Sequence, residues 1–427
     1  MPIIGMPKKT LLKSQFKKNL FVLMSGMAIA QAIPILFSPI LTRFYSPDEF
    51  GYLATFLAVS SFFTVVMSGK YELAIILPKR DEEAINLLSL SALLSFVFTV
   101  VSSILLLFFA RPFTKLFGLT EFESIIWLVP LVSFLATIYL LFNEWSIRKI
   151  NFMILSRNKI SNTSSISGFS LLFGFNKISF GLIFGQIFGQ LTAALLSIYR
   201  MIKEDKGLFK FVSMRKMRFF ASRYADFAKF NIPGQLINTL AVQLPVFFIS
   251  SSFGAAEVGY YALTDRVLGV PLSFLGNSFK DVFKQKAAND YNEQGNCIAI
   301  YKKTTFTLIG LSIIPFILLF IFAPVMFSTV FGEKWLPSGE FTRALCLMYM
   351  LSFVSMPTSW IFVIAEKQKL DLLWQFIFLI FTIISLTIGY VLNNIHYALW
   401  SFCIGRSITF LIQIAITYQL AKGVQRV

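Results

Sequence analysis

A row of basic and polar side chains recurs at helical spacing in the second half of the sequence. Its members follow Arg266 at intervals of +7, +11, +14 and +18: Ser273, Asn277, Lys280 and Lys284. At 100° per residue, all five fall within about 60° of one another on a helix. Cations and amides bind phosphate and other anions, and an arginine fork can form two hydrogen bonds to phosphate. The spacing therefore predicts a helix face that binds an anionic ligand, with Arg266 at one end.

Three other segments carry shorter polar faces. They comprise Arg406, Gln413 and Thr417; Asn231, Gln235 and Asn238; and Gln31, Ser38 and Thr42. We expect these faces to line the same site. A second interpretation applies to the two arginines, which could pair with Asp265, Glu144 or backbone carbonyls and only hold helices together. The row of five favours a binding role for Arg266, because a structural pair needs one cation rather than a row.

The composition places these faces in a membrane. Hydrophobic residues make up 56% of the 427 and charged residues only 14%, whereas about a quarter of a soluble domain is charged. A charged side chain inside a bilayer costs several kcal/mol unless it faces protein or water. The polar faces should therefore surround a water-filled cavity inside the protein. The excess of 38 Lys and Arg over 21 Asp and Glu does not indicate nucleic-acid binding, because basic residues mark the cytoplasmic loops of membrane proteins.

Stretches without Asp, Glu, Lys or Arg define the spans. They run over 19–42, 50–69, 84–110, 124–143, 160–176, 178–199, 230–256, 304–332, 344–365 and 372–405. Two further spans are interrupted by charge, at about 258–279 and about 397–420. The last charge-free stretch, 372–405, is too long for one helix. A turn at 393–396 divides it, and the span at about 397–420 begins after that turn. Because roughly 20 residues of helix cross a bilayer, we expect an all-α polytopic protein with twelve transmembrane helices.

The distribution of basic residues orients these spans. With both termini in the cytoplasm, the inner segments hold 30 Lys and Arg and the outer loops hold 6. An excess of this kind in the cytoplasmic loops is the usual signature of orientation. We therefore expect both termini to be cytoplasmic.

The sequence repeats a motif across its two halves. Residues 49–54 (EFGYLA) are echoed by 257–262 (EVGYYA), six spans later. An even number of spans gives both halves the same orientation, and repeats in membrane proteins commonly flank a substrate path. We expect an N-terminal lobe at 1–205, a basic cytoplasmic linker at 206–231 and a C-terminal lobe at 232–427, around a central cavity. The nine basic residues at 200–231 alternate with phenylalanines, which favours contact with anionic membrane lipid; a specific partner site is the alternative.

Several chemistries lack the residues that they need. His396 is the only histidine, so a multi-histidine metal site is excluded, and the three widely spaced cysteines indicate neither a zinc site nor a disulfide framework. The sequence contains no phosphate-binding loop motif, and we expect no metal and no cofactor. A membrane enzyme such as a polymerase or glycosyltransferase is disfavoured, because no large outer loop is present to carry catalytic carboxylates.

Four segments resemble a known family. Residues 39–51 (PILTRFYSPDEFG), 69–78 (GKYELAIILP), 259–271 (GYYALTDRVLGVP) and 368–375 (QKLDLLWQ) are similar to the bacterial polysaccharide-biosynthesis flippases. These are the Wzx-like O-antigen translocases of the multidrug/oligosaccharidyl-lipid/polysaccharide exporter superfamily. The resemblance covers nearly the whole chain and implies twelve helices in two six-helix lobes. Arg43 and Lys70 lie within these segments and complete the set of candidate substrate-binding residues.

The resemblance also implies a substrate and a location. The substrate would be an undecaprenyl-diphosphate-linked oligosaccharide, an O-antigen or other surface polysaccharide repeat unit, moved across the bacterial inner membrane by alternating access. Other polysaccharide-assembly proteins are the partners that the resemblance implies. The alternative is a drug or cation antiporter of the same superfamily. That alternative is disfavoured because Asp265 is the only acid clearly inside a span, against Arg266 and Arg406. Asp265 and Glu144 are the candidates for ion coupling, and a substrate gradient alone is the rival source of energy.

Overall fold

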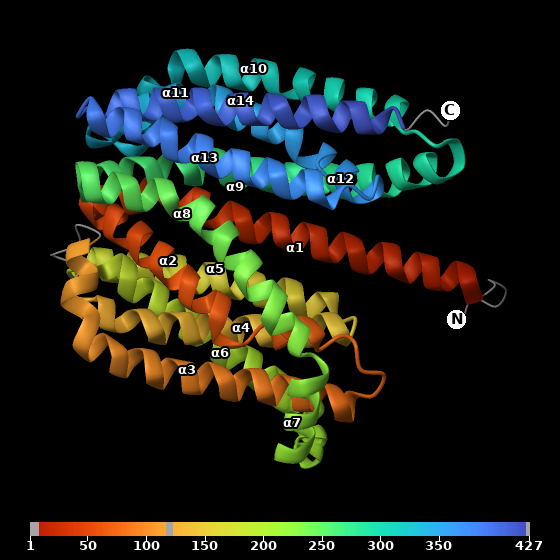
Figure 1. The fold of residues 1–427 in the computed structure, drawn as a ribbon. Helices are drawn as coiled ribbons and strands as arrows, with labels where there is room; N and C mark the ends of the chain where they lie inside the picture. Colours follow the sequence, from red (N-terminus) through yellow and green to blue (C-terminus); the bar gives the residue numbers. More distant parts are fainter. Residues whose placement is uncertain (1–7, 117–122, 424–427) are drawn as a thin grey trace, which may run out of the picture. The chain divides into compact units, whose positions relative to one another are not determined.

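Helices are the regular secondary structure of the part of the chain that the computed structural model describes, residues 8–116 and 123–423 (Figure 1). Twelve helices in that part have 20 residues or more: α1 (Lys8–Phe44), α2 (Pro47–Met67), α3 (Asp81–Leu116), α4 (Val129–Arg148), α5 (Phe152–Phe175), α6 (Gly181–Asp205), α8 (Ile232–Phe253), α9 (Ala255–Gln294), α10 (Ile298–Phe331), α11 (Leu336–Thr358), α13 (Gln368–Val391) and α14 (Ile395–Ala421). The predicted fold class is confirmed, and each of the twelve predicted spans overlaps one of these helices.

Ten of these helices are long and apolar enough to cross a membrane, and α5 and α9 are the other two. Polar residues are frequent in α5, and Asp265 and Arg266 interrupt α9. With 40 residues, α9 is about 60 Å long, twice the roughly 30 Å of a hydrocarbon core. A large part of α9 therefore extends beyond the membrane.

Helix ends follow their local sequence. Ser46 and Glu49 form a reciprocal cap at the start of α2, in which the Ser46 amide donates to Glu49 Oε2 at 2.9 Å and the Glu49 amide donates to Ser46 Oγ at 3.3 Å. Asn394 Oδ1 accepts from the amides of His396 and Tyr397 at the start of α14. The turn predicted at 393–396 is therefore confirmed, and it separates α13 from α14.

The chain forms two compact units. The first comprises Met1–Tyr45 and Tyr52–Phe247, and the second comprises Ser46–Gly51 and Phe248–Val427. Within the first unit, α5 packs on α1 and α6, and α4 packs on α3 and α6. Within the second unit, α11 packs on α9, α10 and α14, and α13 packs on α14.

Glycines allow close helix approach in both units. In the first unit, a Cβ atom added to Gly189 on α6 would lie 2.5 Å from the Cα atom of Ile166 on α5. In the second unit, a Cβ on Gly51 would lie 1.9 Å from the Ala255 oxygen, and one on Gly259 would lie 1.8 Å from the Pro47 oxygen. The glycines of the repeated motif thus bring the start of α2 against the start of α9.

The basic linker is docked within the first unit. It consists of a 3-10 helix (Lys206–Phe211) followed by α7 (Met214–Arg223), which lies beside α3 (Figure 1). Asn86 Oδ1 accepts from the Ser213 amide at 2.9 Å, and the Tyr71 hydroxyl donates to the Ala221 oxygen at 3.0 Å. Because Met217 and Phe220 are buried, part of the apolar face of the linker packs on protein. Phe209 and Phe219 remain exposed.

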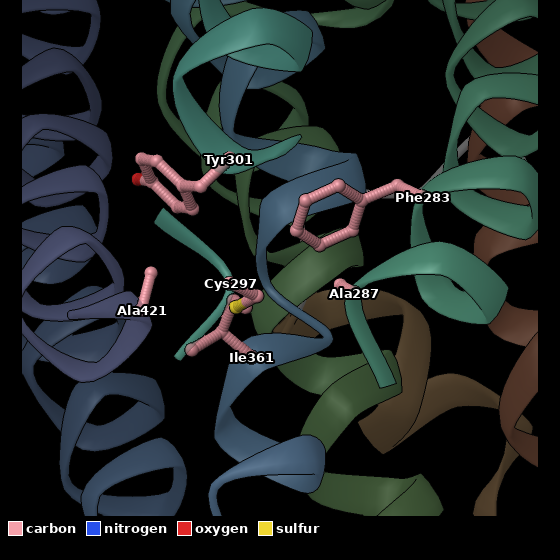
Figure 2. Close-up of a cluster of buried hydrophobic side chains, with 6 residues drawn as sticks. All are labelled: Phe283, Ala287, Cys297, Tyr301, Ile361 and Ala421. Carbon is pink, nitrogen blue, oxygen red and sulfur yellow. The ribbon is translucent and has the colours of Figure 1, made fainter. Parts of the chain in front are cut away.

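A buried cluster joins residues of four helical segments of the second unit (Figure 2). Phe283 and Ala287 of α9 lie with Cys297 and Tyr301, and Ile361 and Ala421 complete the cluster. The Cys297 amide donates to the Ala421 oxygen at 2.9 Å. Burial raises the pKa of the Cys297 thiol to about 11, so this cysteine has the character of a packing residue.

Candidate functional site

The row of polar residues on α9 lies on an accessible face of that helix. Ser273, Asn277 and Lys284 are exposed, and Arg266 and Lys280 are half-buried. Lys280 Nζ donates to Asn277 Oδ1 at 2.6 Å, and Lys284 Nζ lies 3.8 Å from the centre of the Trp360 ring. Exposed ammonium groups are costly against lipid tails. The face is therefore suited to a water-filled space or a charged ligand.

Arg266 and its neighbour Asp265 point to different partners within the second unit. The Arg266 guanidinium lies 5.6 Å from the centre of the Phe50 ring, which packs edge-on against Trp335. Asp265 Oδ1 accepts a hydrogen bond of 2.6 Å from the Tyr349 hydroxyl of α11. The two charges are consecutive and diverge by about 100° around the helix. The half-exposed Arg266 therefore retains an accessible face beside its aromatic contact.

Arg406 lies in the interior of the second unit. Its guanidinium carbon is 3.7 Å from the centre of the Phe378 ring and 5.1 Å from that of Phe402, and its side chain is buried. Gln413 and Thr417, on the same face of α14, are also buried. The Tyr301 hydroxyl lies 2.9 Å from Thr417 Oγ1. This placement fits the interpretation in which Arg406 holds helices together.

The amides predicted on one face of α8 are all exposed, but they do not share a regular helix. Gln235 and Asn238 lie on α8, whereas Asn231 ends a π-helical turn (Phe227–Asn231). A π-turn has more residues than an α-turn, so the rotation of 100° per residue does not hold through the segment that ends at Asn231. Such turns are frequent at functional sites, and the α-helical pattern did not reveal this one.

Arg43 and Lys70, the two basic residues from the family motifs, differ in exposure and in their contacts. Arg43 is exposed at the end of α1. Lys70 has a left-handed backbone (φ 60°) and pairs with Glu72 at 3.5 Å. Glu72 is buried and accepts a hydrogen bond of 2.5 Å from Ser68 Oγ. Lys70 therefore already has an anionic partner in the first unit.

Glu144 lies on α4, half-buried and within electrostatic range of Glu72. No periodic pattern in the sequence marks Glu72, which lies in a 3-10 helix (Tyr71–Ala74), and its burial is decided by the tertiary structure. The role of Glu144 and Asp265 in ion coupling stays a prediction.

A cavity in the first unit brings Gln31 together with residues that the sequence analysis missed. Gln31 of α1 and Tyr139 of α4 line a cavity of about 190 Å³ with Lys159, Asn162 and Thr163 of α5. The spacing of +3 and +4 after Lys159 places the three α5 residues on one helix face. That spacing is present in the sequence, but Lys159 falls just before the predicted span at 160–176.

Comparison with solved structures identifies the fold. The chain is similar to the lipid II flippase MurJ in an inward closed conformation, with a TM-score of 0.72 and 13% identity over 94% of this chain and 89% of that one. A multidrug resistance MATE family transporter of the MOP superfamily gives a TM-score of 0.68 at 15% identity over 93% and 94%. The MATE multidrug transporter DinF-BH gives 0.67 at 14% identity over 94% of each chain. At these identities the similarity establishes the fold alone: a multi-pass membrane protein with the two-lobed twelve-helix fold of these transporters.

A family model makes the assignment more specific. The model described as "Polysaccharide biosynthesis protein" matches residues 40–340. The chain therefore belongs to this polysaccharide biosynthesis family, as the resemblance predicted. A short match to the microsomal signal peptidase 12 kDa subunit covers residues 367–415, which comprise two apolar helices. No curated protein sequence matches the chain.

Proposed function

We propose that the protein is a flippase for lipid-linked oligosaccharide. It carries an undecaprenyl-diphosphate-linked repeat unit of a surface polysaccharide, such as O-antigen, from the cytoplasmic to the periplasmic leaflet by alternating access. In this proposal the protein resides in the bacterial inner membrane with both termini in the cytoplasm. Family membership supports the polysaccharide pathway. The solved flippase with this fold handles lipid II, another lipid-linked substrate.

The observation that carries the proposal is the accessible cationic face of α9. A lipid diphosphate is an anion that requires fixed cations and hydrogen-bond donors. Arg266, Lys280 and Lys284 offer these along a helix that extends beyond the membrane. We assign diphosphate binding to this row, with Ser273 and Asn277 as hydrogen-bonding neighbours. Arg43, Asn231, Gln235 and Asn238 are further accessible candidates for contacts with the substrate.

A drug or cation antiporter is the alternative function. A cation requires accessible carboxylates within the membrane, and Asp265 is exposed. However, its carboxylate already accepts a hydrogen bond from Tyr349, and cations dominate the neighbouring row. The proposed flippase function accounts for the charge of this face, whereas the antiporter does not.

Charge variants of Arg266 test the proposal. In proteoliposomes with a fluorescent undecaprenyl-diphosphate oligosaccharide, flipping per reconstituted protein should fall about tenfold or more in Arg266→Ala, because a charge-assisted contact of ~1.4 kcal/mol is lost. Arg266→Lys should retain partial activity, because it keeps the charge without the fork. Arg266→Glu should be at least as impaired as the alanine variant, because it repels the diphosphate.

The matched control is Lys286→Ala on the same helix. Lys286 is exposed, pairs with Asp290 at 3.8 Å and lies about 160° around α9 from Arg266. Its replacement should leave flipping unchanged. Wild-type activity in Arg266→Ala, or an equal loss in Lys286→Ala, would contradict the proposal. An uncoupler added to wild-type proteoliposomes shows whether an ion gradient contributes.

A further inference from the structure

The cavity in the first unit has polar walls and room for a small ligand. Its volume of about 190 Å³ corresponds to about six water molecules at ~30 Å³ each, which is comparable to one sugar ring and too small for an oligosaccharide. Three separate helices supply its polar groups: α1 gives Gln31, α4 gives Tyr139, and α5 gives Lys159, Asn162 and Thr163.

Two amide oxygens among these wall residues lack hydrogen-bond partners within residues 8–116 and 123–423. Gln31 Oε1 and Asn162 Oδ1 are buried, and neither accepts a hydrogen bond from any residue that the structure describes. A buried acceptor without a donor is unfavourable. Thr163 Oγ1 donates back to the oxygens of Lys159 and Ile160, so its lone pairs also remain available. These residues favour a ligand that donates several hydrogen bonds, as hydroxyl groups do.

Lys159 determines the charge of the ligand. Among the described residues that line the cavity, it alone carries a charge at neutral pH. In the described part of the chain, no carboxylate lies within ion-pair distance of its ammonium group. A half-buried ammonium favours an anionic partner. A cationic ligand would be repelled, and a neutral sugar would leave the ammonium without a counter-charge.

We propose that this cavity is a subsite for one acidic sugar of the transported oligosaccharide. The sugar carboxylate pairs with Lys159 Nζ, and sugar hydroxyls donate to Gln31 Oε1 and Asn162 Oδ1. Lys159 lies seven residues into α5, about 10 Å along the helix. In the predicted orientation this is the cytoplasmic half of the unit, from which the substrate enters. The inference rests on the proposed function and narrows its substrate to repeat units that contain an acidic sugar.

Binding of single sugars to the purified full-length protein in nanodiscs tests the proposal without any transport step. Affinities would be measured by isothermal titration calorimetry with sodium glucuronate, glucose and inorganic pyrophosphate. We expect wild-type protein to bind glucuronate at least about tenfold more tightly than glucose. Lys159→Gln should abolish this preference, whereas Lys159→Arg should keep it. Lys286→Gln, a matched change on α9, should have no effect.

Two further variants test the hydroxyl contacts. Gln31→Leu and Asn162→Leu should weaken the binding of glucuronate and of glucose by the same factor, because each variant removes a hydrogen-bond acceptor without changing the charge of the cavity. Thermal unfolding of each variant shows that it is folded before binding is interpreted.

Three outcomes would overturn the inference. The first is equal binding of glucuronate and glucose, or no glucuronate binding, in the wild type. The second is a preference that survives Lys159→Gln. The third is pyrophosphate binding that exceeds glucuronate binding and disappears in Lys159→Gln, which would assign the cavity to the diphosphate of the lipid. Because these measurements do not involve Arg266 or flipping, glucuronate binding in a protein that does not flip would contradict only the proposed function.

Discussion

Two helix faces in the second unit have nearly the same sequence pattern and opposite surroundings. On α9, Arg266 is followed by polar residues at +7 and +11; on α14, Arg406 is followed by Gln413 and Thr417 at the same intervals. The α9 face is accessible. The α14 face is buried, with the Arg406 guanidinium 3.7 Å from the Phe378 ring centre. Helical periodicity therefore identifies a polar face of a membrane helix, but not whether that face meets a ligand or the protein interior.

The largest difference between the two faces should be in stability. Arg406→Ala removes a buried side chain and its contacts with two rings, and should lower the free energy of unfolding by about 3 kcal/mol. Arg266→Ala, at a half-exposed position, should cost about 1 kcal/mol or less. Denaturant unfolding of the purified proteins in detergent measures both. A larger cost at Arg266 than at Arg406 would reverse the comparison.

A smaller effect should reveal the ring contact of Arg406 itself. Arg406→Lys keeps the charge but loses the planar group that lies over Phe378, and should cost about 1–2 kcal/mol. In a double-mutant cycle, Phe378→Leu and Arg406→Lys should show a coupling energy of about 1 kcal/mol. Additive effects would mean that the contact contributes nothing to stability. The matched pair Phe376→Leu and Arg406→Lys, with an exposed ring on the same helix, should be additive.

The smallest effect on stability should come from the accessible row. Lys280 and Asn277 form a hydrogen bond of 2.6 Å on the exposed face of α9. Lys280→Ala and Asn277→Ala should each change the free energy of unfolding by about 0.5 kcal/mol or less. Both should nevertheless lower flipping several-fold. If the free energy of unfolding instead fell in proportion to flipping, the prediction would be wrong, and this row would have the same structural role as Arg406.

Much of the fold could be predicted because each helix is determined locally. A charge-free stretch of about 20 residues must satisfy its backbone hydrogen bonds internally in lipid, which makes it a helix. The turn at Asn394 and the cap formed by Ser46 and Glu49 were likewise visible as short motifs. The linker was harder. Its composition suggested a lipid surface, whereas Met217 and Phe220 also pack within the first unit.

The site was only partly predictable because its members come from distant segments. The row on α9 lies on one helix and could be found by spacing. The cavity around Lys159 forms only where α1, α4 and α5 pack together. The periodicity of residues within one helix does not predict which other helices pack against it. The π-turn that ends at Asn231, directly before α8, likewise has no obvious signal in the sequence.

The sequence by itself determined that this chain is a twelve-helix membrane protein of the polysaccharide biosynthesis family, with a cationic face on α9. These properties depend on composition, spacing and short motifs, which act over one helix or one turn. Tertiary structure alone decided that Arg406 is buried, that Lys70 pairs with Glu72, and that Lys159 shares a cavity with Gln31 and Asn162. In a membrane protein, polar residues are sequestered from lipid both in the protein interior and in wet cavities. The packing of helices against one another determines which of these surroundings each residue has.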